Sequence, residues 1–384
     1  MADSSTPSTT RAARPRGRGP RRRLATLLLP LLAAWLSAGC SRYTVDMLRD
    51  NKLSSNPMSQ PAHHPDPGAW PDDGLTWSWL GHATVLINLG GSWIVTDPTL
   101  HQRIGPPETF DNALGIRRIT ALPIDPGALP SIDLVLISHA HYDHLDLPSL
   151  RTLAHDKPTV VLPRRTRALL DGTGIEAIEL DWLDGARRQT EAGDGLRVTA
   201  FRVEHYGHVP GTRRRLPSGF NGYLVEKGER RIAFFGDTSY RRHRDAWGKP
   251  LRQPVEIDWA AKFDGRPIDL CILPIGDSHY RHNHTSPAEA LRIALDARCD
   301  TMLPVHYGTF VLTPKRYRLE APAQRLLDIA GKAGVADRLR CDDGDRTLPV
   351  AAIGATCRHN TDGGARPSAD HGSDGGPGAS VDRR

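Results

Sequence analysis

The chain has 384 residues, of which 39% are hydrophobic, and a formal net charge of +6 at pH 7. This length can bury a large core, and the composition fits a globular protein. The net charge resides in the first 39 residues, which hold seven arginines and one acid, so the rest of the chain is neutral. A neutral body gives no support to a basic patch, and we expect no nucleic-acid partner.

The arginine-rich start is followed by an uncharged apolar run at 24–36. This run is short for a membrane span and is typical of the hydrophobic core of a signal peptide. The next residues, Ser-Ala-Gly-Cys, resemble a bacterial lipoprotein cleavage box, which predicts a lipoprotein-type signal peptide over 1–39 and lipidation of Cys40. An ordinary cleaved signal and an uncleaved anchor are the alternatives. We expect an exported protein of the bacterial cell envelope, an outer-membrane or periplasmic lipoprotein held to the membrane through Cys40.

The remainder of the chain divides by composition into three parts. Residues 40–73 are polar and rich in Pro and Asn, which predicts a flexible tether. A folded domain is predicted over 74–358. Residues 359–384 are Gly, Ser, Asp and Arg with almost no apolar residue, which predicts a disordered tail.

Strand-like and helix-like patterns are interspersed through the predicted domain. The expected strands cover 76–80, 84–89, 93–96, 134–138, 159–162, 197–202, 222–226, 231–235, 270–274 and 301–305. The expected helices cover 147–154, 164–170, 287–297 and 322–333. The first three strands follow one another closely as a meander, which favours mixed sheets over a doubly wound parallel sheet.

Asp97 directly follows the expected strand 93–96. Its carboxylate can accept a hydrogen bond from a ligand histidine and fix the tautomer of that ring, or it can cap the turn at Pro98. His82, within Gly-His-Ala, is expected to be a buried, hydrogen-bonded structural histidine.

The densest group of candidate ligands follows the apolar run Ile-Asp-Leu-Val-Leu-Ile, which is typical of a buried strand. His139 and His141 are two residues apart at the end of this strand, so they point the same way. Asp143 and His144 lie on the turn that follows. Neutral imidazole and carboxylate are the ligands of zinc and similar divalent ions, and four donors so close together favour two metals. A solvated polar loop is the alternative.

Other polar residues are candidates for contacting a substrate. His284 can orient a substrate or protonate a leaving alkoxide, because imidazole can be tuned across pH 7; a surface histidine at a helix entry is the alternative. Tyr142 and Tyr307 are candidates for lining a pocket. Arg213 lies in a run of three arginines that can meet phosphate head groups or simply be solvated.

The remaining cysteines show no Cys-x-x-Cys spacing, so a thiolate metal site is not expected. Cys271 lies inside an apolar run and is predicted to be a small buried residue. Cys341 and Cys357 can pair in an oxidising compartment, which the sequence leaves open.

The motif H-x-H-x-D-H after a strand resembles the metallo-β-lactamase superfamily, whose later ligands are a His, a bridging Asp and a final His. His205, Asp237 and His306 supply these in order, each at the end of a β-type run. By this resemblance His139, His141 and His205 hold one metal, Asp143, His144 and His306 hold the other, and Asp237 bridges them. The resemblance implies an α/β fold, an αββα sandwich in which two mixed sheets lie face to face with helices outside and the metals along one edge.

A narrower resemblance covers the chain from Leu75 to Phe310. The motifs W-L-G-H-A-T-V, T-D-P, G-D-T-S-Y, L-P-I-G and V-H-Y-G-T-F are similar to those of the N-acyl-phosphatidylethanolamine-hydrolysing phospholipase D family and its bacterial relatives, which include sugar-lactone hydrolases. In that family the residues matching Asp97 and His284 belong to the active site. The aromatic-rich stretch that the phospholipases carry after Pro-Ile-Gly is replaced here by Asp-Ser-His-Tyr-Arg-His-Asn.

The resemblance implies a dinuclear enzyme that binds two Zn²⁺, or other divalent metals, and hydrolyses a phosphodiester of N-acyl-phosphatidylethanolamine-like phospholipids through a metal-bound hydroxide. Asp143, His284 and Asp97 are then the catalytic candidates. The enzymatic alternative is a hydrolase of lactones or other small carboxylic esters. A metal-binding envelope lipoprotein without catalysis is the alternative from another class. The sequence leaves the oligomeric state open.

Overall fold

The computed structural model describes residues 58–105, 115–183, 189–192, 195–206, 219–244, 250–276, 284–312, 321–342, 347–349 and 353–359. The chain divides into two units, residues 1–55 and 56–384, and all described residues belong to the second. The predicted signal peptide, the lipidation site Cys40, the first part of the tether, Arg213 and nearly all of the predicted tail lie outside the described residues. Among the described helices, none has both the length and the apolar character needed to cross a bilayer.

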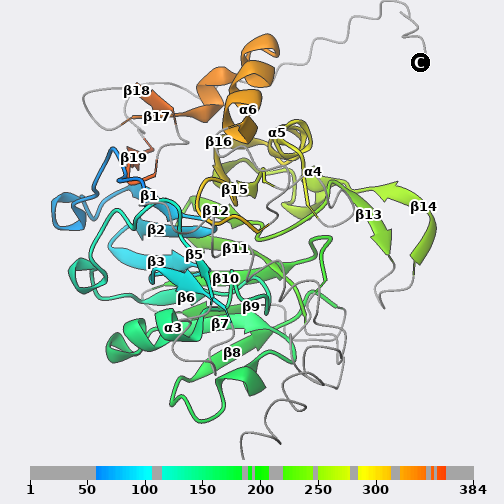
Figure 1. The fold of residues 1–384 in the computed structure, drawn as a ribbon. Coiled ribbons are helices and arrows are strands. Elements are labelled where there is room, and N and C mark those ends of the chain that lie inside the picture. The colour runs from blue at the N-terminus through cyan, green and yellow to red at the C-terminus, as the bar shows by residue number, and fades with distance from the viewer. Residues whose placement is uncertain are drawn as a thin grey trace, which may run out of the picture. The chain divides into compact units, whose positions relative to one another are not determined.

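Two mixed β-sheets form the body of the second unit (Figure 1). In its described part, one sheet has nine strands in the order β18-β17-β19-β1-β2-β3-β6-β7-β8 and the other has six in the order β16-β15-β12-β11-β10-β9. The strands of the larger sheet are β1 (Leu75–Gly81), β2 (Thr84–Leu89), β3 (Ser92–Thr96), β6 (Leu134–Leu136), β7 (Thr159–Pro163), β8 (Ala177–Leu180), β17 (Arg340–Asp342), β18 (Thr347–Pro349) and β19 (Thr356–Arg358). Those of the smaller sheet are β9 (Gln189–Ala192), β10 (Leu196–Phe201), β11 (Gly222–Lys227), β12 (Arg230–Phe234), β15 (Ile268–Pro274) and β16 (Cys299–Val305).

Strand direction changes within each sheet. The expected meander is confirmed, because β1, β2 and β3 pair antiparallel, while β3, β6, β7 and β8 pair parallel. In the smaller sheet β9 to β12 are antiparallel, and β12, β15 and β16 are parallel. Several candidate ligands lie just beyond the carboxyl end of a strand in the parallel part of a sheet. The strands concerned are β6, β12 and β16.

The core between the sheets and the core beneath the helices are built from alternate residues of the same strands. On β2, Val85 and Ile87 pack in the cluster that includes Val198 and Ile232 of the smaller sheet, whereas Leu86 packs on the other side. This is the period-two alternation of a strand buried on both faces.

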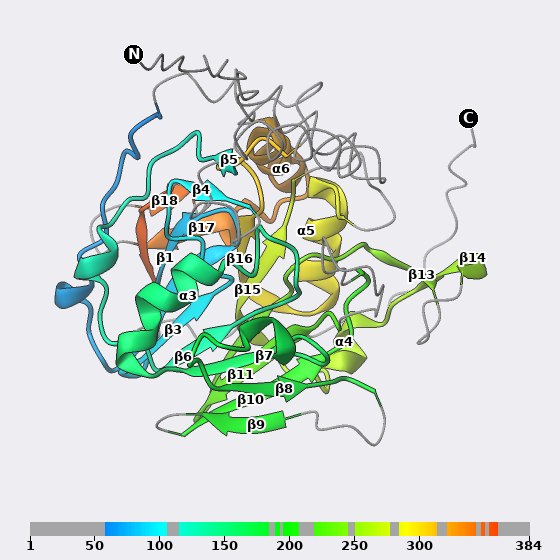
Figure 2. The ribbon, with the colours of Figure 1, turned by 60° about the horizontal axis from the view of Figure 1, so that its bottom comes forward.

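Helices cover the outer faces of both sheets (Figure 2). Helix α3 (Leu147–Leu153) packs Leu150 and Leu153 against the outer side of the larger sheet, and its N-cap Asp146 accepts a hydrogen bond from Ser149 N. Helix α5 (Pro287–Asp296) packs on β15 and β16 and neighbours α4 (Trp259–Lys262) and α6 (Ala321–Lys332). The expected αββα sandwich is confirmed.

The prediction of a helix over 164–170 is wrong. A single 3₁₀ turn, Arg167–Leu170, occupies this stretch. The carboxylate of Glu179 accepts hydrogen bonds from the backbone N–H groups of Thr166 and Arg167, which fixes a turn beside β8 in place of a longer helix.

Residues 58–73, assigned to the tether by composition, are packed against the domain. Ser59 donates from its backbone N–H to Ile119, and the rings of Trp70 and Trp93 stack with centroids 5.4 Å apart. Trp70 is buried. These residues therefore belong to the folded unit, because an indole buried against a strand residue holds the segment in place.

Cys271, predicted to be a small buried residue, is buried and forms a disulfide with Cys299. Both residues are buried on the neighbouring strands β15 and β16, so strand pairing brings them together across 28 positions of sequence. Cys357 is also in a disulfide, and its strand β19 pairs with β17, which carries Cys341.

Candidate metal centre

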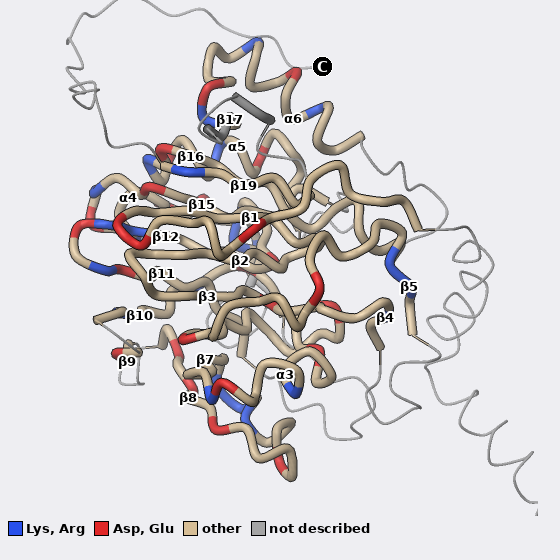
Figure 3. Tube along the Cα trace, turned by 90° about the vertical axis from the view of Figure 1, so that its left-hand side faces the viewer, with Lys and Arg blue, Asp and Glu red and all other residues tan. Residues whose placement is uncertain are grey.

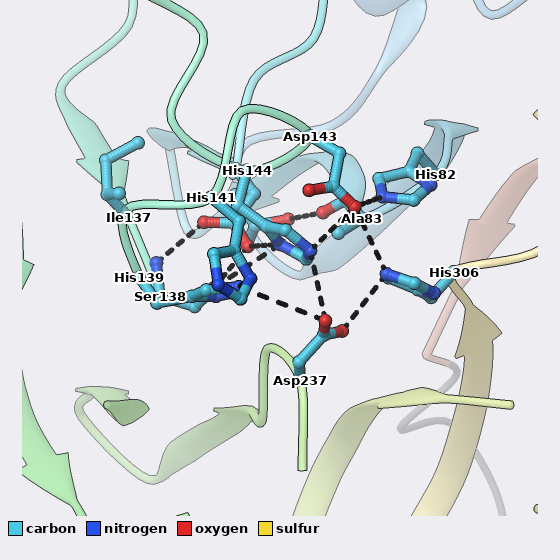
Figure 4. A network of polar contacts seen from close by, with 12 residues as sticks. His82, Ala83, Ile137, Ser138, His139, His141, Asp143, His144, Asp237 and His306 are labelled. Carbon is cyan, nitrogen blue, oxygen red and sulfur yellow. Dashed lines mark hydrogen bonds and ion pairs between the residues drawn. The ribbon is translucent and has the colours of Figure 1, made fainter. Parts of the chain in front are cut away.

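Side chains with nitrogen and oxygen donors gather where strands of the two sheets end, and Figure 4 shows most of them converging on one point. They follow β6, β10, β12 and β16, so both sheets contribute. All seven ligand candidates named from the sequence are brought together: His139, His141, Asp143, His144, His205, Asp237 and His306.

The first group of donors consists of three imidazoles. His139 Nε2 lies 2.7 Å from His141 Nδ1, and His205 Nε2 lies 3.3 Å from the same atom. Burial, then the nearby His144, lowers the pKa of His139 well below its usual value, and burial lowers the pKa of His141 to about 4. Both rings are therefore neutral at pH 7, the state in which imidazole binds a metal.

The second group combines a carboxylate with imidazoles. Asp143 Oδ2 lies 3.4 Å from His144 Nε2 and 3.5 Å from His306 Nε2. The same oxygen lies 3.0 Å from Nε2 of His82, the residue that the sequence predicts to be structural. Burial, then the charge of His306, lowers the pKa of His82 to about 3. His82 is therefore neutral, and its ring N–H can donate to Asp143.

Asp237 lies between the two groups (Figure 4). Its Oδ2 is 3.3 Å from His144 Nε2 and 3.9 Å from His139 Nε2, and its Oδ1 is 3.3 Å from His306 Nε2. Burial would raise the pKa of Asp237, but His306 and His144 hold it well below its usual value. The side chain is thus an ionised carboxylate that faces both groups, which suits it to bridge two cations.

The residues fit divalent cations. Among the described residues, three buried atoms at this point have no hydrogen-bond partner: His144 Nε2, His306 Nε2 and Asp237 Oδ1. Each unsatisfied buried polar atom costs about 1–3 kcal/mol, so a cluster of them indicates a ligand that satisfies all three. Imidazole nitrogens and carboxylate oxygens are the donors that zinc and related divalent ions take.

Asp97 fixes the orientation of His144 from behind. Its Oδ2 lies 2.6 Å from His144 Nδ1 and accepts a hydrogen bond of 2.5 Å from Ser138 Oγ, and its Oδ1 accepts one of 2.7 Å from Ser138 N. His144 can therefore donate from Nδ1 to Asp97, which directs Nε2 toward Asp237 and makes it the nitrogen available to a metal ion. Of the two roles that the sequence offers for Asp97, the structure shows the hydrogen bond to a candidate ligand histidine. Ser138 carries no signal in the sequence beyond its place before the motif.

At two positions near the centre, neighbouring atoms come so close to the backbone that only glycine fits. A Cβ atom on Gly236, whose φ is +56°, would lie 2.3 Å from the Cβ of Ser138. A Cβ atom on Gly276 would lie 1.8 Å from the carbonyl oxygen of His306. The glycines of the G-D-T and P-I-G motifs thus let Asp237 and His306 come close to their neighbours.

The other predicted site residues lie in different surroundings. His284 Nδ1 lies 3.6 Å from Asp237 Oδ2, so His284 joins the centre. Tyr142 is half-buried within the motif. The ring of Tyr307, a candidate for lining a pocket, is buried in the hydrophobic core against Trp79 with centroids 4.7 Å apart, so its place is in packing.

Tyr206 is a residue that the sequence reasoning missed. Its side chain is 46% exposed, and its ring stacks on His205 with centroids 4.9 Å apart and meets the edge of His141 at 5.1 Å. An aromatic residue directly after a candidate ligand histidine is the signal in the sequence that could have identified it. The ring forms part of the rim of the centre.

Comparisons with known proteins agree with this geometry. A sequence profile described as the beta-lactamase superfamily domain matches residues 92–307, more than half of the chain. An uncharacterised protein of Mycobacterium tuberculosis is 30% identical over 266 residues, which cover 67% of this chain and 64% of that protein. The N-acyl-phosphatidylethanolamine-hydrolyzing phospholipase D 1 of Caenorhabditis elegans is 28% identical over 272 residues, 67% of this chain and 70% of that enzyme.

A protein of Thermus thermophilus named as a metal-dependent hydrolase is 30% identical over 248 residues, 64% of this chain and 89% of that protein. The match to the mycobacterial relative spans less than two thirds of the length of that protein. The matched profile includes all seven ligand candidates, from His139 to His306. The chain belongs to the metallo-β-lactamase superfamily.

Proposed function

We propose that this protein is a dinuclear zinc phosphodiesterase of the phospholipase D type, acting on N-acyl-phosphatidylethanolamine-like phospholipids. One observation carries the dinuclear assignment. Asp237 presents one carboxylate oxygen to His144 and the other to His306, with the imidazoles of His139 and His205 at 3.9 and 3.7 Å from Oδ2. A structural zinc site needs only four ligands and is closed, whereas seven donor residues, one of which is a shared carboxylate, suit two ions with room for a substrate.

The residues divide between two ions. His139, His141 and His205 would hold one, and Asp143, His144 and His306 would hold the other, with Asp237 shared. When bound, such a pair of cations lowers the pKa of water toward neutrality and offsets negative charge that develops on a phosphoryl or carbonyl oxygen.

The protein's own groups orient this centre and assist the leaving group. Asp97 holds His144, and His82 holds Asp143. His284 lies near Asp237, has a side chain that is 13% exposed, and is therefore accessible from the centre as a donor to a leaving alkoxide. In this assignment His284 loses its proton to the departing oxygen and regains one from solvent.

The substrate class rests on the relatives and on the rim. The C. elegans relative is named for hydrolysis of N-acyl-phosphatidylethanolamine. The exposed ring of Tyr206 beside His205 offers an apolar contact that an acyl chain or glycerol backbone can use. On the side shown in Figure 3, acidic and basic segments of the described chain are interspersed.

We also propose that the protein works in the cell envelope, exported by its arginine-rich leader and anchored through lipidated Cys40. The buried disulfide between Cys271 and Cys299 supports an oxidising compartment, since such bonds are rare in reducing cytosol. An anchored enzyme would remain beside its phospholipid substrates.

The proposal is tested with purified protein carrying its native metal. Metal content is measured by mass spectrometry, and turnover is measured on bis-p-nitrophenyl phosphate, N-acyl-phosphatidylethanolamine vesicles and a panel of lactones. We expect two ions per chain, turnover of both phosphodiesters, and no activity in Asp237→Asn with the fold retained. Turnover of lactones alone would contradict the phospholipase assignment and favour the ester hydrolase. Two bound ions without any turnover would favour a non-catalytic metal-binding lipoprotein.

A further inference from the structure

Arg118 follows β5 (Ile116–Arg117) and is a buried cation, with 1% of its surface exposed. Figure 3 marks the arginines at β5 in blue, and β5 pairs only with the two-residue strand β4 (Arg103–Ile104) in the described structure. No described carboxylate forms an ion pair with Arg118. Burial lowers the pKa of its guanidinium to about 10, so the group stays charged at neutral pH. A buried charge without a counter-ion is costly, which points to a specific use.

The guanidinium of Arg118 donates hydrogen bonds to backbone carbonyl groups near the centre. Nη2 donates to Leu80 O at 2.6 Å, Nη1 donates to Thr99 O at 2.7 Å, and Nε donates to Thr120 O at 3.1 Å. Leu80 lies two residues before His82, and Thr99 lies two residues after Asp97. Arg118 therefore ties together the two segments that hold Asp143 and His144.

Each of the two segments that Arg118 joins has an unusual backbone conformation, at His82 in one and at Asp97 in the other. His82 has φ 50° and Asp97 has φ 30°, in the left-handed region that side chains other than glycine seldom adopt. Such conformations are strained and persist only where the surroundings impose them. Gly81 permits the imposed geometry, because a Cβ there would lie 2.4 Å from Nη2 of Arg118.

A third segment, after β16, is joined to the same point. The guanidinium lies 5.6 Å from the ring centroid of Phe310, and that ring meets the ring of His82 edge-on at 5.3 Å. Thr309 Oγ1 accepts a hydrogen bond of 2.7 Å from the backbone N–H of His82. His306 donates from its own backbone N–H to His82 O at 2.9 Å.

We propose that Arg118 is a positioning residue for one half of the centre, the donor group of Asp143, His144 and His306. It fixes the backbone of His82 and Asp97, which orient two of these donors, and packs on the segment that carries the third. In the described structure the donor group of His139, His141 and His205 does not contact Arg118 directly. Its link to Asp97 runs through Ser138, whose Oγ lies 3.0 Å from His139 Nδ1 and donates to Asp97 Oδ2. The inference rests on the proposed two-metal centre and adds that only the half formed by Asp143, His144 and His306 depends directly on Arg118.

The test compares full-length wild type with Arg118→Met, which keeps the volume of the side chain and removes its charge and donors. Protein loaded with zinc is titrated with a chelator, and bound metal and unfolding temperature are measured in parallel. We expect the affinity of one of the two ions to fall about 10- to 100-fold in Arg118→Met, as for other groups that orient metal ligands. The other ion should keep its wild-type affinity.

Controls separate positioning from general destabilisation. Arg118→Lys keeps the cation but cannot span three carbonyls, so it should weaken the same ion by a smaller factor; it also serves as the test variant if Arg118→Met does not fold. Arg117→Met, at the half-exposed neighbour, should leave both affinities unchanged. Arg118 variants that keep both ions at wild-type affinity, or lose both equally, would overturn the inference. Wild type that binds fewer than two ions would instead contradict the proposed function.

Discussion

His82 Nε2 lies 3.0 Å from Asp143 Oδ2, although the two residues are 61 positions apart. The contact joins the turn after β1 to the H-x-H-x-D-H motif after β6, and it matches the way Asp97 reaches His144 from the end of β3. Asp143 and His144 are therefore each held by a residue that follows another strand of the same sheet, β1 for His82 and β3 for Asp97. This arrangement makes the affinity for metal depend on residues that need not touch a metal themselves.

Replacing His82 tests this dependence. His82→Asn tolerates the left-handed backbone at this position but is too short to reach Asp143. We expect metal affinity to fall about 10- to 100-fold, because the ligand carboxylate loses its orienting partner. Isothermal titration of metal into the stripped protein measures the change. His101→Asn is the matched control, since His101 is exposed and contacts Thr152, and an equal loss in both variants would contradict the role given to His82.

The pH dependence of the metal-free protein follows from His141. Its pKa in the folded state is lowered from 6.5 to about 4, first by burial. As the pH falls from 6.5 to 4, the unfolded chain takes up a proton that the folded chain does not, so the folded state loses stability through this window. Chelator-treated His141→Gln should therefore lose less stability between pH 6.5 and 4 than the wild type does. Identical unfolding curves against pH for the two proteins would exclude this origin.

The substrate class is tested at Tyr206. Because its exposed ring lies beside His205 at the rim, Tyr206→Ala should raise KM for phospholipid vesicles several-fold while kcat and the KM for bis-p-nitrophenyl phosphate stay close to wild type. Val255→Ala serves as the control, because Val255 on β14 (Pro250–Glu256) is similarly exposed at 48%. Equal effects of Tyr206→Ala on both substrates would argue against an acyl-chain contact.

The sequence predicts well which candidate ligands come together, because their signal is local. Four donors lie within six positions after a strand, and His205, Asp237 and His306 each follow a recognisable β-type run. Strand ends in such a sheet meet at one edge, so the side chains placed there converge without further information. The meander of β1, β2 and β3 is predicted for the same reason, since its strands are adjacent in the chain.

The rest depends on contacts that local pattern does not encode. A buried structural histidine and a histidine that orients a ligand look alike in sequence, so the role of His82 emerges only when Asp143 is seen beside it. Arg118 has the same difficulty, because its partners are backbone carbonyls of distant segments. Tertiary structure also sets the disulfide of Cys271 with Cys299, which are 28 residues apart. It likewise sets the pairing of β19 with β1, which come from opposite ends of the domain.

The central claim is that one carboxylate, Asp237, bridges two metal ions. Anomalous diffraction from crystals of the purified protein, recorded on both sides of the zinc absorption edge, tests it directly. We expect two peaks roughly 3.5–4 Å apart, one beside His139, His141 and His205 and the other beside Asp143, His144 and His306, with Asp237 between them. A single peak, or a pair of peaks that Asp237 does not separate, would contradict the account.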